Sequence, residues 1–394
     1  MLTKININDF DYNLPQNRIA KYPLENRSKS KLLVAQPSSE SISHHIFEDI
    51  VDLLDFNSVL YINKTKVISG RFYMVKETGG RVEILLVEPV EPSNDPQIAL
   101  QAKGTSIWKA IIGGKRVRIG TKLEDINGFV RAEILEKEAN EVKVKLTWEH
   151  GTFSELLLNT GVLPLPPYLN RESEETDKES YQTVFAQNDG SIAAPTAGLH
   201  FTEELLSKLK EKGIKIRELT LHVGPGTFLP VSSDNIDEHK MHSEMFSVNK
   251  SIIKDLKQDL IDNKKIICVG TTSIRTVESL FWAGNNIEEF SRSSLVKQWS
   301  PYENENVTGA IESLDNLINY FEGDVIQGKT ELIIVPGYEF RFTKGLITNF
   351  HVPKSTLLLL VSAFVGEQWK DIYKSALDNN YRFLSYGDSS LLLR

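Results

Sequence analysis

A run of short strand patterns in the middle of the chain most strongly limits what it can fold into. Between residues 66 and 149, short β-rich runs recur between turns, and apolar and polar residues alternate clearly in the last two of them. Such alternation is typical of strands with one buried face, and short strands at this spacing predict a small antiparallel barrel or sandwich. We expect strands over Gly80–Val87, Ile107–Ile112, Arg116–Gly120, Val130–Leu135 and Val142–Trp148.

Helix and strand patterns alternate in the rest of the chain. Thr202–Lys212 resembles an amphipathic helix that Thr202 would cap and Gly213 would end. Strand patterns over Ile214–Val223 and Lys265–Val269 flank a helical pattern over Ser251–Asp262. This alternation indicates an α/β domain.

These patterns predict an α/β main domain with an inserted all-β domain, a small barrel. We assign residues 1–65 and 150–394 to the α/β catalytic domain and residues 66–149 to the inserted barrel. Residues 284–328 are polar, acidic and weakly patterned, so we expect them to form a surface insertion in the main domain.

Composition narrows the class of protein. The 394 residues can form two or three domains, and a net charge of −8 argues against a protein held to nucleic acid by bulk charge, although a local basic patch stays open. The single cysteine, Cys268, excludes an internal disulfide and fits a reducing compartment. The longest apolar run, Leu357–Val365, is about half as long as a membrane helix. We expect a cytoplasmic monomer with no membrane contact.

Two loops that combine His with Gly and Pro indicate a substrate pocket. The first is Ala193–Phe201, which contains His200, and the second is Leu221–Phe228, which contains His222. Gly and Pro disfavour a helix or strand interior, whereas a loop of this kind lets a ligand approach the backbone. Histidine adds a group that can change its protonation near neutral pH. For one such loop alone, a sharp turn with a hydrogen-bonded His would be the simpler interpretation.

A third segment, Cys268–Thr276, has the pattern of a strand, a Gly turn and a helix start. Free N–H groups at a helix N-terminus favour an anion, and the hydroxyl groups of Thr271 and Thr272 add donors. Arg275 follows where a carboxylate or phosphate would bind. The alternative is a plain helix cap by Thr272 or Ser273.

A fourth segment, Leu346–Thr356, repeats the order of strand, polar loop and helix, with Ser355 as the expected cap. In open α/β sheets ligands bind beside the carboxyl ends of strands. Asn349, His351 and Lys354 would then face the ligand, although a connecting loop with a hydrogen-bonded His is the alternative.

The segment His239–Glu244 places two His and a carboxylate together, which could be half of a metal site. No second pair at ligand spacing supports a metal, so we expect acid–base or substrate contacts instead and no metal.

The strand-rich block carries a run of cations without an acid between Lys103 and Lys122. One interpretation is binding of a phosphate backbone, and the other is a solvated face of a β-ribbon. The residues expected to bind RNA are Lys103, Lys109, Lys115, Arg116 and Arg118.

Taken together, these motifs resemble one family along nearly the whole chain, the S-adenosylmethionine:tRNA ribosyltransferase-isomerases of the queuosine pathway. Besides the two His loops, the matching segments are Phe10–Pro15, Gly79–Leu86, Leu163–Tyr168, Tyr181–Ala186, His239–Glu244, Gly270–Arg275, Thr348–Ser362 and Tyr381–Asp388.

The resemblance implies that the ribosyl part of S-adenosylmethionine is transferred and isomerised onto 7-aminomethyl-7-deazaguanine at the wobble position of tRNA. The product is epoxyqueuosine in tRNA, and adenine and methionine leave. The resemblance also implies an α/β main domain interrupted by a β-barrel. S-adenosylmethionine would be the ribosyl donor, and tRNA carrying the aminomethyl base would be the partner.

Residue chemistry then gives expected roles within that reaction. We expect His200, His222, His351 and Asp388 to be catalytic, the three His in proton handling and Asp388 in orienting a hydroxyl or an amine. The residues expected to contact S-adenosylmethionine or the acceptor are Thr196, Gly198, Gly224, Gly226, Thr227, His239, His242, Glu244, Thr271, Thr272, Arg275, Asn349 and Lys354.

Three departures from the family pattern leave alternatives open, and one is that residues 284–328 form a longer segment than the family usually has. Lys31 and Lys66 stand where the family usually has Arg, and Lys does not replace the two-pronged Arg fork. A diverged paralogue with another acceptor, or a non-catalytic RNA-binding protein with this fold, would be the alternatives. A methyltransferase would be expected to show an early Gly-rich turn and an acidic ribose-binding residue, and the sequence has no such pair near its N-terminus.

Overall fold

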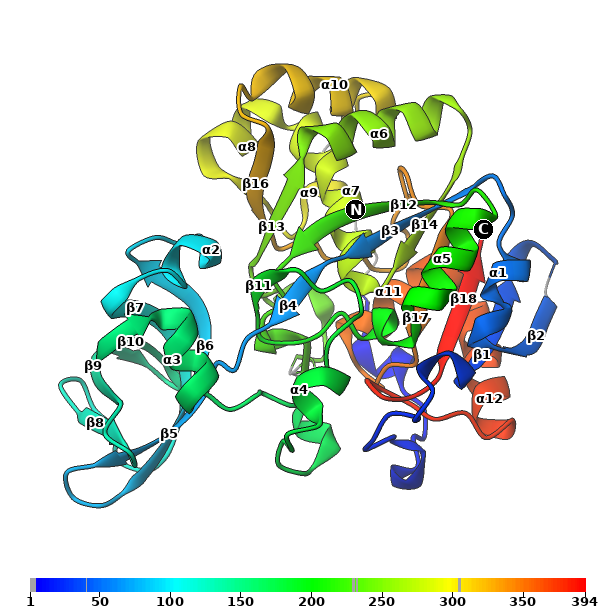
Figure 1. Cartoon of the computed structure of the whole chain (residues 1–394). Helices are drawn as coiled ribbons and strands as arrows, with labels where there is room; N and C mark the ends of the chain where they lie inside the picture. Colours follow the sequence, from blue (N-terminus) through cyan, green and yellow to red (C-terminus); the bar gives the residue numbers. More distant parts are fainter. Residues whose placement is uncertain (1–4, 40, 229–230, 232, 304–305) are drawn as a thin grey trace.

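The computed structural model describes residues 5–39, 41–228, 231, 233–303 and 306–394, and its strands form a large mixed sheet and a separate closed barrel (Figure 1). Helices pack on the sheet, and the barrel lies to one side of it (Figure 1). The predicted fold class, an α/β main domain with an inserted all-β barrel, is therefore confirmed.

The main sheet has ten strands in the described part of the chain, and its four central strands β12, β3, β14 and β17 run parallel. Their carboxyl ends consequently meet at one edge of the sheet. The order across the sheet is β15 (Leu295–Val296), β16 (Val325–Thr330), β13 (Glu244–Asn249), β12 (Lys215–Leu221), β3 (Ser58–Asn63), β14 (Lys265–Val269), β17 (Gly345–Asn349), β18 (Ser389–Leu393), β1 (Lys31–Gln36) and β2 (Ser41–Ile46).

Helices cover both faces of this sheet. One face packs in a single apolar cluster against α6 (Lys250–Ile261), α7 (Thr271–Asn285), α10 (Ala310–Tyr320), α11 (Thr356–Val365) and α12 (Trp369–Asp378). The other face packs against α1 (Ile50–Leu53) and α5 (Glu203–Glu211). Helix α5 forms as predicted: Thr202 accepts a hydrogen bond from the amide of Leu205, and Leu205 and Leu209 lie one turn apart on its buried side.

The barrel closes through six antiparallel strands around buried Trp108 and Phe153. In barrel order the strands are β10 (Glu141–Thr152), β7 (Lys103–Gly113), β6 (Arg81–Glu91), β5 (Arg71–Lys76), β8 (Lys122–Asp125) and β9 (Val130–Glu138). The short helices α2 (Pro96–Ala99) and α3 (Phe153–Thr160) add side chains to the same apolar cluster.

The strand predicted over Arg116–Gly120 is wrong. This segment is a turn, because Arg116 and Gly120 both have positive φ, 57° and 79°, which extended backbone does not allow. Val117 is nevertheless buried in the barrel core, and this accounts for the strand-like pattern.

The expected surface insertion at residues 284–328 is also wrong. Helix α10 packs directly on α7, and a Cβ added at Gly284 would lie 1.9 Å from the carbonyl oxygen of Ser313. The segment also holds α8 (Ile287–Ser293), α9 (Ser300–Glu303) and part of β16, a strand of the main sheet. Residues 304 and 305 lie outside the described residues. The segment has the pattern of a surface insertion because most of its residues are polar, although side chains such as Leu314 and Leu317 are fully buried.

Polar contacts join the barrel to the main domain. Lys329 of β16 forms an ion pair with Glu88 of β6, and the Gln327 amide donates to Asp95 at 3.0 Å. Nearby, the chain segments that enter and follow the barrel form a two-stranded parallel sheet of β4 (Thr65–Val67) and β11 (Asn188–Ser191). The remaining helix, α4 (Asp177–Ser180), lies in the following loop region. Among the described residues, no helix has the length and apolarity to span a membrane.

Candidate active site

A cleft opens where the central parallel strands end, the place where α/β sheets bind ligands. With its open mouth it encloses about 690 Å³, within the usual range of small-molecule sites. We call it the main cleft. Its walls are formed by Tyr168, Ala193, Ala194, Pro195, Thr196, Ala197, Val223, Gly270, Thr271, Thr272, Thr348, Asn349, His351, Val352, Leu357, Leu384 and Ser385.

The N-terminus of α7 faces the main cleft without a side-chain cap. Gly270 occupies the cap position, and the Ser273 hydroxyl donates to the carbonyl of Val269 instead of capping the helix. The hydroxyl oxygen of Thr272 is buried and has no hydrogen-bond partner among the described residues. Uncapped amides and an unsatisfied buried hydroxyl together indicate a site for an anion or another acceptor.

Asn349, at the end of β17, is held in the main cleft by a buried network. Its oxygen accepts from the Thr196 hydroxyl at 3.1 Å, and its nitrogen lies 3.2 Å from Nε2 of His200. Nδ1 of His200 lies 2.8 Å from the hydroxyl of Ser30. With the Asn349 amide as donor, Nε2 accepts and Nδ1 carries the proton. Burial, helped by Arg382 and Arg27, lowers the pKa of His200 to about 3.

His351 lies in the wall of the main cleft itself. Its Nε2 is 2.9 Å from the hydroxyl of Thr348. Its backbone is fixed on both sides, since its amide donates to the Tyr373 hydroxyl at 3.1 Å and its carbonyl accepts from Tyr12. Burial lowers the pKa of His351 to about 3, so the imidazole is neutral at pH 7 and one of its ring nitrogens carries no proton.

A second pocket adjoins the main cleft and shares Leu357 with it. Gly226, His239, His242, Glu244 and Arg275 line it. A Cβ at Gly226 would lie 2.1 Å from the His242 ring, so a larger residue there would require that ring to move. Burial lowers the pKa of His239.

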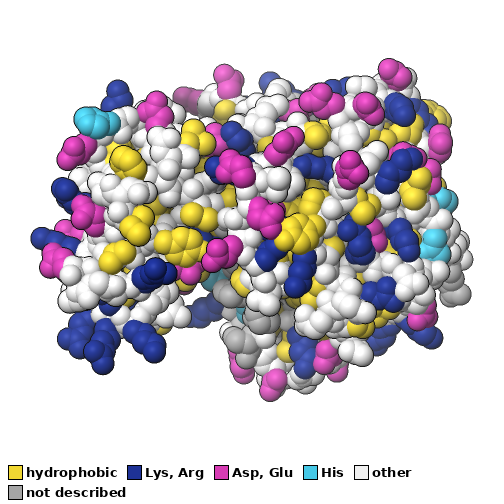
Figure 2. Space-filling model, turned by 60° about the horizontal axis from the view of Figure 1, so that its bottom comes forward, with side chains coloured by type: hydrophobic (Ala, Val, Ile, Leu, Met, Phe, Trp, Pro, Cys, Tyr) yellow, Lys and Arg dark blue, Asp and Glu magenta, His cyan; other side chains and the backbone are white. Residues whose placement is uncertain are grey.

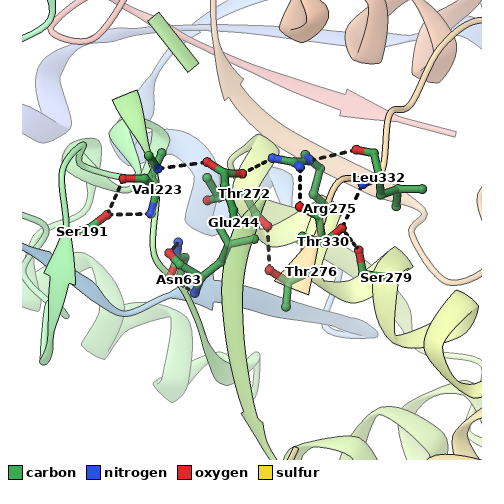
Figure 3. A network of polar contacts seen from close by, with 12 residues as sticks. Asn63, Ser191, Val223, Glu244, Thr272, Arg275, Thr276, Ser279, Thr330 and Leu332 are labelled. Atoms are coloured by element: carbon green, nitrogen blue, oxygen red, sulfur yellow. Dashed lines mark hydrogen bonds and ion pairs between the residues drawn. The ribbon is translucent and has the colours of Figure 1, made fainter. Parts of the chain in front are cut away.

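Arg275 and Glu244 form a buried ion pair in this second pocket (Figure 3). The guanidinium also donates to the carbonyls of Leu332 and Thr330, at 3.1 and 3.3 Å, and Glu244 accepts from the amide of Gly224 at 3.2 Å. The charge of Arg275 is therefore neutralised inside the protein, which does not fit its expected role as the main anion ligand.

His222 lies on the barrel side of the main domain. Its Nδ1 is 2.9 Å from the hydroxyl of Thr65, and its Cε1 lies 3.0 Å from the Cβ position of Gly190. The ring is partly exposed, but surrounding protein atoms desolvate it and lower its pKa to about 4. It does not line the main cleft, although the next residue, Val223, does.

Several other expected site residues lie outside the two pockets. Asp388 is buried, and its carboxylate accepts hydrogen bonds from the backbone amides of Lys31 and Arg382, at 3.0 and 2.8 Å. Both carboxylate oxygens are therefore already bonded to the backbone. Lys354 forms an ion pair with Asp11 at 3.1 Å. Gly198 packs against Phe185. The side chain of Thr227 lies outside the described residues.

The cleft also contains residues that sequence reasoning missed. The hydroxyls of Tyr168 and Ser385 lie 2.5 Å apart in its wall, and Thr348 borders it beside His351. Both Tyr168 and Ser385 belong to segments that carry the family resemblance. That position within a motif was the available signal, because neither residue type is distinctive alone.

The expected RNA-binding cations lie along strand β7 and in the turn that follows it. Lys103 begins the strand, and Lys109 is paired with Glu88 at 3.0 Å. At the other end, Lys76 donates to the carbonyls of Lys115 and Arg116. Figure 2 shows Lys and Arg side chains gathered at the lower left, on the barrel side. We call Lys76, Arg81, Lys115, Arg116 and Arg118 the barrel-tip cluster; apart from the half-buried Lys76 they are exposed.

Fold and cleft together define an α/β protein with an inserted barrel and a cleft at the carboxyl ends of its central strands, with His351 in the cleft wall. Among the described residues, no three His, Cys, Asp or Glu side chains are grouped as metal ligands.

Comparison with known proteins agrees with this class. A family model described as queuosine biosynthesis protein matches residues 7–392. The S-adenosylmethionine:tRNA ribosyltransferase-isomerase of Aquifex aeolicus is 38% identical over 389 residues, covering 98% of this chain and 99% of the relative. That of Clostridioides difficile is 38% identical over 387 residues and covers 98% of both chains. A crystal structure of S-adenosylmethionine tRNA ribosyltransferase from Thermotoga maritima is 29% identical, covers 98% of this chain and 100% of that chain, and has a TM-score of 0.48.

The chain therefore belongs to the queuosine biosynthesis protein family, the family of the S-adenosylmethionine:tRNA ribosyltransferase-isomerases. The resemblance inferred from the sequence motifs is confirmed.

Proposed function

We propose that this protein transfers and isomerises the ribosyl group of S-adenosylmethionine onto 7-aminomethyl-7-deazaguanine at the wobble position of tRNA. The products are epoxyqueuosine in tRNA, adenine and methionine. The near full-length similarity to the ribosyltransferase-isomerases supports this proposal.

The uncapped N-terminus of α7 is the observation that best supports a binding site for the ribosyl donor, S-adenosylmethionine. Its uncapped amides and the Thr272 hydroxyl, which has no hydrogen-bond partner in the part of the chain that the structure describes, face a cleft of suitable size. The carboxylate of the methionine part of S-adenosylmethionine is an anion that such donors bind. The sulfonium, ribose and adenine would then extend along the cleft past Asn349 and His351.

Proton handling in the reaction is assigned to the imidazole that borders the cleft. The sulfonium acidifies the adjacent ribose carbon, and departing adenine needs a proton, so the site needs a group that accepts and returns one. His351 is neutral and lies in the cleft wall. His200 acts through Asn349, since both its nitrogens are engaged. His222 contacts Thr65 near the barrel and would act from the acceptor side.

One assay tests the proposed function directly. The protein is incubated with S-adenosylmethionine and tRNA that carries the aminomethyl-deazaguanine base, and free adenine and methionine are measured. Release of both, dependent on both substrates and unchanged by a chelator, is the expected result. Release with another acceptor but not with this tRNA would instead favour a diverged paralogue.

Replacing Thr272 with Val should raise the KM for S-adenosylmethionine at least ~10-fold, the scale of a lost hydrogen bond to a charged group. Val keeps the shape of Thr but removes its hydroxyl. An analogue of S-adenosylmethionine that lacks the carboxylate provides a second measurement. It should inhibit the wild type and the variant equally, because it cannot use the Thr272 hydroxyl in this way. Thr276→Val is the matched control. Among the described residues, the Thr276 hydroxyl bonds only the backbone carbonyl of Thr272 in its own helix. An unchanged KM in Thr272→Val would show that the carboxylate of S-adenosylmethionine does not bind at the N-terminus of α7.

Replacing Lys115, Arg116 and Arg118 together with Ser should raise the KM for tRNA and flatten its dependence on salt, because phosphate contacts release counterions. The affinity for S-adenosylmethionine should not change. A titration of tRNA at two salt concentrations measures both effects, with Arg292→Ser/Lys297→Ser on exposed surface as the control. Equal affinities and parallel salt slopes would show that the barrel-tip cluster is only a solvated surface.

A further inference from the structure

A third pocket lies beside the main cleft and contains two guanidinium groups. Arg27 and Arg382 line it, together with Ser30 and His200, and Ser385 belongs to both this pocket and the main cleft. We call it the flanking pocket. Two Arg side chains this close to a substrate site require an explanation, since like charges repel where solvent is scarce.

Arg27 has no carboxylate partner within 4.0 Å in the described ranges of the chain. Its guanidinium donates only to the carbonyls of Gln182 and Glu179, at 2.7 and 3.0 Å. The side chain is half-buried, and desolvation lowers the pKa of Arg27. Charged groups in such places are ordinarily paired. The Glu179 carboxylate acts on Arg27 only from beyond ion-pair distance, so the positive charge of Arg27 is only partly balanced.

Arg382 contributes a second charge that is only partly balanced. Its guanidinium lies 3.7 Å from Asp388, beyond a good hydrogen bond. Both oxygens of Asp388 already accept from backbone amides. After burial, the charges of Arg382 and Arg27 also lower the pKa of His200, which lies in the same pocket, so the pocket is electropositive. An anion would be stabilised there.

The surroundings of the flanking pocket suit RNA in particular. Leu24, in its wall, is 37% exposed, and the neighbouring Tyr22 is 51% exposed with the Arg171 guanidinium 4.3 Å from its ring centre. Exposed rings stacked with Arg are the surfaces on which single-stranded bases stack. A base that enters the main cleft keeps its own phosphates outside the cleft, and the flanking pocket shares Ser385 with the cleft wall.

We propose that Arg27 and Arg382 bind a backbone phosphate of the RNA strand next to the nucleotide whose base enters the main cleft. This inference rests on the proposed function, because it requires an RNA acceptor. The contact positions the strand and carries no sequence information. It is separate from the barrel-tip cluster, which belongs to the other domain.

The same pair of arginines could instead bind the carboxylate of S-adenosylmethionine. Steady-state kinetics separate these two sources of anion. Arg382→Gln should raise the KM for tRNA at least ~10-fold while the KM for S-adenosylmethionine stays within about twofold. Arg27→Lys, which keeps the charge but loses the fork, should show a smaller change in the same direction. Arg292→Gln on exposed α8 is the control, and thermal unfolding confirms that each variant folds.

Direct binding of the tRNA to wild type and Arg382→Gln at two salt concentrations supplies a readout that does not need turnover. Weaker binding with a shallower salt slope in the variant supports the phosphate site. Equal binding overturns it, and so does a raised KM for S-adenosylmethionine with an unchanged KM for tRNA. If wild type binds tRNA no better than an unrelated RNA and releases no adenine, the proposed function is wrong as well. If wild type is active but Arg382→Gln binds tRNA equally well, only the phosphate site in the flanking pocket is wrong.

Discussion

Replacing Arg275 with Met is expected to lower the free energy of unfolding by about 3–5 kcal/mol, the cost of leaving one member of a buried ion pair alone. Arg275 and Glu244 have side chains that are only 6% and 3% exposed. Without the guanidinium, the Glu244 carboxylate would keep the amide of Gly224 as its one hydrogen-bond partner among the described residues. Urea denaturation of the variant and of wild type measures the loss.

The double variant Glu244→Gln/Arg275→Met tests the cause of that loss. It removes both charges, so it should recover much of the stability that the single variant loses. The exposed pair Arg292 and Glu288, 3.9 Å apart, is the matched control, since Arg292→Met should cost less than about 1 kcal/mol. A single Arg275→Met variant as stable as wild type would contradict the importance of the pair.

The main elements of the fold were predictable from the sequence because their patterns are local. The helix at α5, the strand Lys265–Val269 and the start of α7 after Gly270 all follow from periodicity and cap residues within a few positions. The turn at Arg116–Gly120 was not predictable in this way, because buried Val117 gives it the pattern of a strand. Residues 284–328 were misjudged because their few buried side chains meet α7 and β13 only in the folded protein.

The segments that form the candidate site were predictable from the sequence, but the contacts between their side chains were not. The Gly- and His-rich loops and the N-terminus of α7 were recognised, and Thr271, Thr272, Asn349 and His351 do line one cleft. Long-range partners decide the rest. Ser30 meets His200 across 170 positions, and Glu244 meets Arg275 across 31 positions. No local pattern shows that these contacts neutralise a charge or occupy both nitrogens of an imidazole.

Replacing His351 with Gln is expected to lower kcat at least ~100-fold, the usual scale for a lost acid–base group. Among the three expected catalytic imidazoles, His351 is the one in the wall of the main cleft, whereas His200 lies behind Asn349 and His222 lies toward the barrel. Gln keeps polar atoms at similar reach but cannot accept a proton at neutral pH. Single-turnover release of adenine at saturating S-adenosylmethionine and tRNA measures the effect on the chemical step.

The split between binding and turnover distinguishes a catalytic role for His351 from a structural one. A proton-handling group should change kcat while the KM values for both substrates and the thermal unfolding temperature stay near those of wild type. Because burial lowers the pKa of His351 to about 3, the ring stays neutral between pH 5 and 7, so its protonation should not reduce wild-type turnover over that range. The exposed His150→Gln variant controls for loss of an imidazole as such. Near-normal kcat in His351→Gln would leave its hydrogen bond to Thr348 as a purely structural contact and shift proton handling to His222, which also bears a neutral ring.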